Sequence, residues 1–167
     1  MHSMTNNIAI TGMGIVSSIG TSLETNRKSL LQATSGLGQL QKINSIHASE
    51  IKVGEVALSN SEISAALKLP PNHNFTRTAL LGSLAAKEAL VKAMGTGFRG
   101  VSHLDCGVLR GAQGAPRLVF SARLAERLRA DGVQRAHLAL TDQGEWVLAT
   151  VVLEGSGALG AAALEIA

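Results

Sequence analysis

The chain has 167 residues, the size of a single domain that can bury a proper core. Its formal net charge of +3 comes from scattered Lys and Arg and only 2% of its residues are aromatic, so it lacks the basic, aromatic-interleaved surface typical of nucleic-acid binding. No basic segment precedes an apolar run at the N-terminus, and no apolar run reaches the length of a membrane span, so we expect neither a secretion signal nor a transmembrane segment.

The first half of the chain predicts short elements separated by polar turns. Ile8–Gly14 is a short apolar strand, and the capping-box pattern at Thr21–Glu24 starts a helix that reaches about Ala33. Glu50–Leu58 alternates enough for a second strand. A second capping box, Ser59–Glu62, opens a short helix that ends before a pair of prolines.

The second half predicts one long helix followed by two hairpins. The long helix runs from about Phe75 to Met94, with Gly95 as its C-cap. One hairpin turns at Gly111–Gly114 and the other at Gln143–Gly144, and an Arg-rich helix, Ala122–Asp131, separates them. Residues 156–167 are low in complexity, and we expect a frayed end or a short helix there.

Three sets of candidate functional residues are judged by their sequence context. The single cysteine, Cys106, excludes an internal disulfide and fits a reducing cytoplasm, and its place in the middle of a strand predicts a structural role and not a nucleophile. We expect no zinc site, because metal-like spacing is missing among this cysteine and the histidines at positions 47, 73, 103 and 137. Arg123, Arg127 and Arg129 form either a solvated helix face or a docking surface for an acidic helix.

Glu88 and Lys92 stand one helical turn apart on the long helix, just before the glycine-rich stop at Gly95–Gly97. A carboxylate can bind Mg²⁺, an ammonium can bind phosphate, and a glycine loop lets backbone N–H groups approach a ligand. This combination suits a magnesium-bound pyrophosphate. A surface ion pair beside a helix C-cap is the alternative, worth roughly 0.2–0.5 kcal/mol.

The wider sequence adds a family resemblance to this pattern. Residues 85–97 read A-A-K-E-A-L-V-K-A-M-G-T-G, followed in order by a strand at Leu104–Leu109, the turn that contains Pro116, the Arg-rich helix and a closing hairpin up to Glu154. In these motifs, residues 85–155 resemble the holo-acyl-carrier-protein synthases, the small phosphopantetheinyl transferases that activate carrier proteins. The resemblance implies an α+β fold in which a long helix lies on an antiparallel sheet.

The resemblance also implies an activity in fatty acid biosynthesis and a set of partners. Such an enzyme transfers 4′-phosphopantetheine from coenzyme A to a serine of apo-acyl carrier protein and uses Mg²⁺. Because family members are often trimers with the site between protomers, we expect a homo-oligomer. The implied site has Glu88 as metal ligand, Lys92 at the phosphates, Asp142 as a polar catalytic group, and Gly95, Thr96, Gly97 and Pro116 along the coenzyme A site.

The N-terminal part resembles a different family. Residues 6–20 and the helix pattern at 77–90 look like the start of a β-ketoacyl-acyl-carrier-protein synthase, which has a thiolase-like fold. All seven Asn and all six Lys precede residue 93, whereas seven of the nine Arg lie at or after Arg99. These shifts predict a chimera, with a β-ketoacyl synthase-like fragment at 1–84, a holo-acyl-carrier-protein synthase-like region at 85–155 and a tail at 156–167.

One departure from the transferase pattern bears on activity. The family's first strand carries G-x-D-I-x-E, whose Asp is the second metal ligand, but the corresponding region here, Gly12–Ser18, has no carboxylate. We therefore expect impaired transferase activity. Two alternatives stay open: an inactive β-ketoacyl synthase fragment, and a module that binds coenzyme A or a carrier protein without turnover.

Overall fold

The computed structural model describes residues 12–143 and 146–155. Its elements in chain order are β1 (Gly12–Val16), α1 (Leu23–Leu31), β2 (Gly38–Gln39), β3 (Lys52–Val53), α2 (Asn60–Ala66), α3 (Arg77–Ala93), the 3₁₀ helix η1 (His103–Asp105), β4 (Cys106–Arg110), β5 (Pro116–Phe120), α4 (Ala122–Ala130), β6 (Val133–Gln143) and β7 (Trp146–Gly155). Within these ranges no helix combines the length and apolar character that a bilayer crossing needs.

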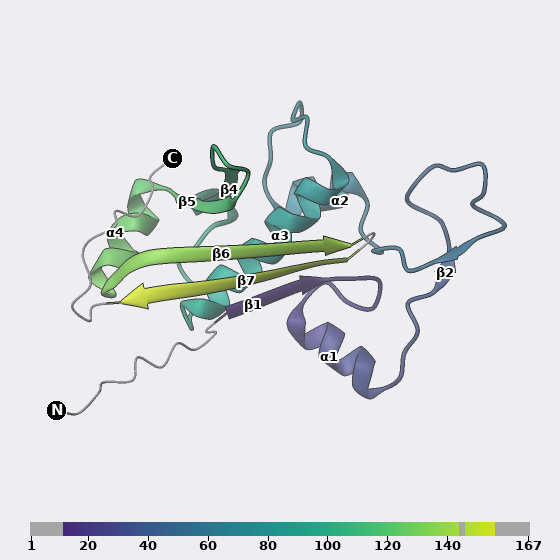
Figure 1. Cartoon of the computed structure of the whole chain (residues 1–167), viewed down its shortest axis with the longest axis horizontal. Coiled ribbons are helices and arrows are strands. Elements are labelled where there is room, and N and C mark those ends of the chain that lie inside the picture. Colours follow the sequence, from purple (N-terminus) through teal and green to yellow (C-terminus); the bar gives the residue numbers. More distant parts are fainter. Residues whose placement is uncertain (1–11, 144–145, 156–167) are drawn as a thin grey trace.

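The central sheet has three antiparallel strands in the order β1-β7-β6 (Figure 1). The N-terminal strand β1 pairs with the C-terminal strand β7 along its whole length, from Gly12 opposite Val151 to Val16 opposite Val147. The first and last described strands therefore belong to one sheet. The 1–84 fragment expected from the sequence thus contributes a strand to the same fold as residues 85–155.

Helix α3 lies on one face of this sheet, as the family resemblance implies. Its close approach to β1 depends on glycines, because a Cβ at Gly12 would lie 2.0 Å from the backbone oxygen of Ala89, and one at Gly14 equally close to that of Ala85. The facing positions of α3 are alanines, which keep both surfaces flat. Helix and strand backbones therefore pack at a distance that side chains at these glycines would not allow.

The core is largely aliphatic, with the ring of Phe120 buried among the aliphatic side chains. Its fully buried members include Val16 from β1, Leu80 and Leu90 from α3, and Val147 and Val151 from β7. Apolar residues of α2, α4 and β5 extend the same cluster, so one continuous core joins the N- and C-terminal parts. Helix α3 itself runs across the expected boundary between residues 84 and 85.

The capping box predicted at the start of α2 is confirmed, whereas the one predicted at the start of α1 is displaced by one residue. Ser59 and Glu62 form the predicted capping box at the start of α2. The box that opens α1 is instead formed by Ser22 and Thr25, one residue later than predicted, with Ser22 as the N-cap. Either hydroxyl could have capped the helix, since Ser and Thr are both good N-cap residues.

The strand expected over Glu50–Leu58 is wrong for most of its length. Only Lys52–Val53 is extended in a ladder, paired with Gly38–Gln39. Just after it, the Glu55 carboxylate accepts hydrogen bonds from the backbone N–H groups of Gln41, Lys42 and Ile43 at 2.7–2.9 Å. These contacts order a loop, which extends away from the central sheet in Figure 1.

The second half follows the prediction closely. Helix α3 begins after the N-cap Thr76 and ends at Ala93, and β4 and β5 form the first hairpin. Strands β6 and β7 form the second hairpin, whose predicted turn at Gln143–Gly144 lies partly outside the described residues. The predicted strand at residues 8–11 and the tail at 156–167 also lie outside them.

Candidate active site

The Glu88–Lys92 pair forms on α3, with Lys92 Nζ 3.8 Å from Glu88 Oε1. The Glu88 side chain is only 13% exposed, whereas that of Lys92 is 40% exposed. The ammonium can thus reach a ligand at the surface, while the carboxylate is held inside. This partly buried pair differs from the fully solvated one that spacing alone allowed.

Glu88 also has a contact that the sequence did not predict. Its Oε1 accepts a hydrogen bond of 3.1 Å from the backbone N–H of Leu23, the first residue of α1. Burial raises the pKa of Glu88 above its ordinary value of 4.5, although the Leu23 N–H and the Lys92 charge act in the opposite direction. Glu88 thereby anchors the start of α1 to the middle of α3.

The glycine loop after α3 is open on its outer side. Gly95 has φ 70° and Gly97 has φ 56°, both in the left-handed region that favours glycine. A Cβ built at either position would meet no atom within 4 Å. Free space therefore adjoins the backbone of the loop, three to five residues beyond Lys92, where a ligand could approach.

Pro116 and Asp142 lie away from the Glu88–Lys92 pair in the single chain. Asp142 is exposed near the end of β6, which is the opposite edge of the central sheet from β1, and Pro116 begins β5, which packs beside β6. Glu88 lies on the other side, because α1, which it anchors, packs against β1. The structure thus brings Glu88, Lys92 and the glycine loop together on α3 but leaves the other two candidates apart.

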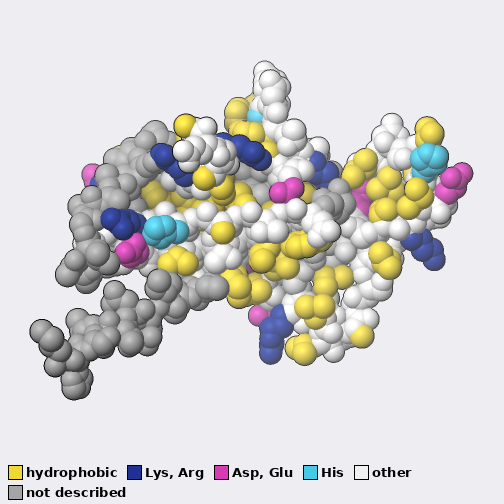
Figure 2. All heavy atoms as spheres, viewed as in Figure 1, with side chains coloured by type: hydrophobic (Ala, Val, Ile, Leu, Met, Phe, Trp, Pro, Cys, Tyr) yellow, Lys and Arg dark blue, Asp and Glu magenta, His cyan; other side chains and the backbone are white. Residues whose placement is uncertain are grey.

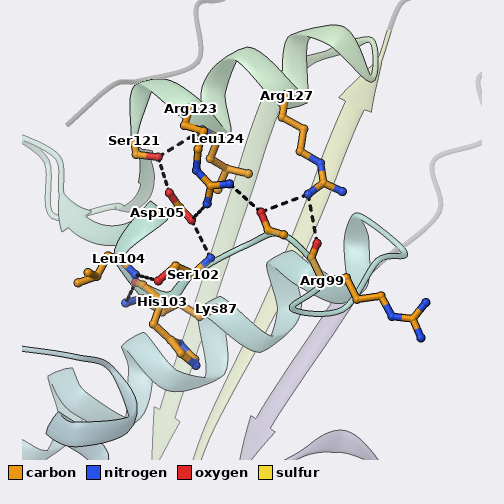
Figure 3. A network of polar contacts seen from close by, with 11 residues as sticks. Lys87, Arg99, Ser102, His103, Leu104, Asp105, Ser121, Arg123, Leu124 and Arg127 are labelled. Carbon is orange, nitrogen blue, oxygen red and sulfur yellow. Dashed lines mark hydrogen bonds and ion pairs between the residues drawn. The ribbon is translucent and has the colours of Figure 1, made fainter.

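A second polar cluster lies near the glycine loop and was not predicted from the sequence. Buried Asp105 accepts hydrogen bonds from Ser102 N at 2.7 Å and from Ser121 Oγ at 2.8 Å, and it forms an ion pair with Arg123 (Figure 3). Arg123 and Arg127 turn their guanidinium groups toward the backbone oxygens of Arg99 and Gly100, just beyond the glycine loop. Ser102 three residues before Asp105 is a capping-box signal that could have revealed part of it.

The buried lysine of the cluster was also missed. Lys87, 6% exposed, crosses from α3 to donate a hydrogen bond of 2.6 Å to the backbone oxygen of His103. Burial lowers its pKa from the ordinary value of 10.5, with the Cys106 thiol acting in the opposite direction. Cys106 itself is buried, and burial raises the pKa of its thiol to about 12, which confirms the prediction of a structural cysteine.

A cavity of about 380 Å³ lies beside this cluster. It is lined by Lys68, Phe98, Gly100, Val101, Ser102, His103 and Arg123. Most of its wall is thus the segment that follows the glycine loop, and neither Glu88 nor Lys92 is part of the lining. Lys68 and Arg123 give it a positive character, and the rings of Phe98 and His103 pack at 4.4 Å.

Metal-ligating residues are sparse. Among the described residues, no three His, Cys, Asp or Glu side chains gather closely enough to hold a metal ion. Glu88 is the carboxylate that pairs with Lys92, and strand β1 carries none. Because Mg²⁺ is commonly held by one or two carboxylates together with substrate phosphates, Glu88 meets only the minimum requirement.

Relatives of known identity share the sequence and the fold. No family model matches the chain. A holo-[acyl-carrier-protein] synthase from Shewanella loihica is 47% identical over 73 residues, which are 43% of this chain and 55% of that protein. The chain spans about half the length of this relative and of several others like it.

Two further comparisons extend across nearly the whole of the matched protein. A holo-[acyl-carrier-protein] synthase from Sphingopyxis alaskensis is 39% identical over 130 residues, which cover 71% of this chain and 95% of that protein. The crystal structure of the synthase from Neisseria meningitidis superposes with a TM-score of 0.51 and 29% identity, covering 87% of this chain and 99% of that chain.

These alignments also bear on the expected chimera. Residues 85–167 make up only half of the chain, so an alignment that covers 71% of it must include residues before Ala85. The comparisons give no support for a β-ketoacyl synthase fragment with a thiolase-like fold. From its identity to a relative that it covers almost completely, and from its mixed α/β fold, the chain belongs to the holo-[acyl-carrier-protein] synthase family.

Proposed function

We propose that the protein transfers 4′-phosphopantetheine from coenzyme A to a serine hydroxyl of an apo-acyl carrier protein, with release of adenosine 3′,5′-bisphosphate. The observation that carries this proposal is the Glu88–Lys92 pair directly before an open glycine loop, in a fold shared with these synthases. Phosphoryl transfer needs little covalent chemistry from the protein and depends on positioning and on neutralising charge. A partly exposed ammonium and an accessible loop backbone meet both needs.

Each candidate residue has a role in this proposal. Lys92 binds the diphosphate of coenzyme A, since its ammonium is paired only loosely with Glu88. The backbone of Gly95, Thr96 and Gly97 lines the coenzyme A site in close contact with the ligand. Glu88 is the residue that would bind Mg²⁺, which when bound would neutralise charge on the diphosphate. One oxygen of this carboxylate already accepts the Leu23 N–H, so the protein has little left to offer a metal ion.

Pro116 and Asp142 complete the site from a second copy of the chain in this proposal. They lie on the β6 side of the sheet, opposite the edge that faces Glu88, so two copies could combine the two halves.

The outer face of the sheet supports self-association, because hydrophobic side chains gather there (Figure 2), with Met13 39% exposed and with Ile15 and Leu148 half-buried. Sedimentation velocity will detect a trimer if this arrangement forms.

The catalytic rate is expected to be low. The family resemblance implies two carboxylates at the metal, and β1 supplies none here. The acyl carrier protein as acceptor and the cytoplasm as location belong to the same proposal, and the latter fits the free thiol of Cys106.

The test is a phosphopantetheinylation assay read as the mass shift of a purified apo-acyl carrier protein. We expect a slow, time-dependent shift that Lys92→Ala reduces about 10–100-fold through loss of a charged phosphate contact, while Lys92→Arg keeps part of it. Lys28→Ala, on the exposed face of α1, is the matched control. No shift with any carrier protein, together with no binding of coenzyme A, would refute the proposal.

A second candidate function follows from the missing carboxylate. A module that binds coenzyme A without turnover would keep the Lys92 and glycine-loop contacts and lose only the metal-dependent step. Calorimetry with coenzyme A, with and without Mg²⁺, separates the two candidates. Binding without any mass shift of the carrier protein favours the module, whereas a mass shift favours the transferase.

A further inference from the structure

The segment between α3 and β4 contains three glycines in the left-handed region. Gly95, Gly97 and Gly100 have φ values of 70°, 56° and 69°. Glycine loses more conformational freedom on folding than any other residue, so a segment that depends on three of them needs contacts from outside to keep one conformation. The part of the segment nearest the ligand-binding candidates, Gly95 and Gly97, has open space beside it.

Those outside contacts come from α4. Arg123 Nη1 donates to the backbone oxygen of Gly100 at 3.1 Å. Arg127 Nη1 donates to the oxygens of Arg99 at 3.2 Å and of Gly100 at 3.4 Å. Figure 3 shows both guanidinium groups reaching from the helix above to this turn of the chain. Two arginines thus fix the distal end of the glycine segment, while α3 fixes the proximal end.

Arg123 is itself oriented by Asp105. The same guanidinium that donates to Gly100 pairs through Nη2 with the Asp105 carboxylate. Asp105 is 7% exposed and is further fixed by Ser102 N and Ser121 Oγ, so its position is set by the core and not by solvent. Charge-assisted hydrogen bonds to a buried carboxylate are among the stronger contacts in proteins.

We propose that Arg123, oriented by Asp105, is a positioning residue that holds the segment Gly95–Gly100 in the conformation that coenzyme A binds. This inference rests on the proposed function for the part that concerns coenzyme A. Its structural part stands on the contacts alone. Arg123 also lines the 380 Å³ cavity together with Phe98, Gly100 and His103, so releasing the segment would change the cavity wall as well.

The test combines hydrogen exchange with ligand binding in the full chain. Arg123→Ala is expected to raise amide exchange across residues 95–101 about tenfold or more, because local opening no longer breaks the two charged contacts. Calorimetry is expected to give a coenzyme A affinity about tenfold weaker for Arg123→Ala, with exchange in β7 unchanged. Arg123→Lys, which cannot bridge Asp105 and Gly100 with one planar group, should fall between the two.

Arg129→Ala is the matched control, since Arg129 lies on the same helix outside the contacts with this segment. It should leave exchange and affinity within about twofold of the unmodified protein. Should Arg123→Ala fail to fold, Arg123→Lys carries the test, with faster exchange across residues 95–101 and weaker coenzyme A binding than in the unmodified protein as the expected result.

The outcomes separate this inference from the proposed function. Unchanged exchange across residues 95–101 in Arg123→Ala would overturn it, whatever the affinity. Faster exchange with unchanged affinity for coenzyme A would overturn the positioning role. If the unmodified chain bound no coenzyme A, the proposed function and the coenzyme A part of this inference would both fail, and the exchange data would still decide whether Arg123 holds the segment.

Discussion

Asp105 stays ionised although it is almost completely buried. Burial by itself would raise its pKa, but the hydrogen bonds from Ser102, Ser121 and Arg123 and the charge of Arg123 lower the pKa below the ordinary value of 3.8. A carboxyl whose pKa is lowered on folding stabilises the protein above its unfolded value, and this contribution disappears as the pH falls from 3.8 through the lower folded value. The Asp105 contacts should therefore fail in acid.

Asp105→Asn tests this expectation. The variant should be less stable by about 1–3 kcal/mol at neutral pH, because the Arg123 charge loses its buried partner. The difference from the unmodified chain should shrink as the pH falls below 3.8, which thermal unfolding over a pH series will measure. Glu50→Gln, at an exposed pair with His47, should show no such difference. A pH-independent gap between Asp105→Asn and the unmodified protein would contradict the assignment.

Glu88 titrates in the opposite sense. Its pKa is raised by burial, so its charged form destabilises the folded chain as the pH rises from 4.5 through the raised value. Glu88→Gln keeps an oxygen for the Leu23 N–H and removes the charge, so the melting temperature at pH 7 should not fall. We expect the same variant to lose any effect of Mg²⁺ on coenzyme A affinity.

Calorimetry with coenzyme A at several Mg²⁺ concentrations, alongside thermal unfolding, measures both quantities for Glu88→Gln. Chelation of Mg²⁺ with EDTA should weaken coenzyme A binding to the unmodified chain and leave the variant unchanged. A variant that still responds to Mg²⁺ would show that another group binds the metal ion, and a lower melting temperature would show that the anchor on α1 needs the charge.

At the scale of elements, the contact between β1 and α3 is set by backbone proximity. Gly14→Ala would place a methyl group 2.0 Å from the Ala85 oxygen, so strand and helix must separate. We expect the free energy of unfolding to fall by about 1–3 kcal/mol, as for other overpacked cores, and urea unfolding will measure it. Gly38→Ala, where the added Cβ meets nothing within 4 Å, should cost far less. Equal losses of stability in the two variants would show that the backbone conformational change from Gly to Ala matters more than the contact with α3.

At the scale of the whole molecule, the N-terminal part is needed for the fold of the C-terminal part. A fragment of residues 77–167 would lose β1 from the edge of β7, and with it Val16 from the core and the α1 start that Glu88 contacts. We expect this fragment to lack a cooperative thermal transition in circular dichroism. A fragment that unfolds cooperatively near the melting temperature of the full chain would instead support two separately folded pieces.

Prediction from sequence was accurate where the signal was local. The Ser59–Glu62 box, the end of α3 before Gly95 and the two hairpins all depend on hydrogen bonds between residues close in the chain. The prediction of a strand over Glu50–Leu58 was wrong because the structure of this segment depends on a contact that is not local. Glu55 binds three backbone N–H groups of residues 41–43, and the alternating pattern of the segment does not encode this contact.

The long helix, the spacing of Glu88 and Lys92 on it, and the glycine loop that follows could all be predicted from the residues alone, since helical periodicity sets which side chains share a face. Three contacts became visible only in the folded chain: β1 pairs with β7, Glu88 binds the start of α1 from 65 residues away, and Arg123 reaches Asp105 and Gly100. Such contacts join segments far apart in the chain, and they form because the core brings their backbones together, which no local pattern of residues encodes.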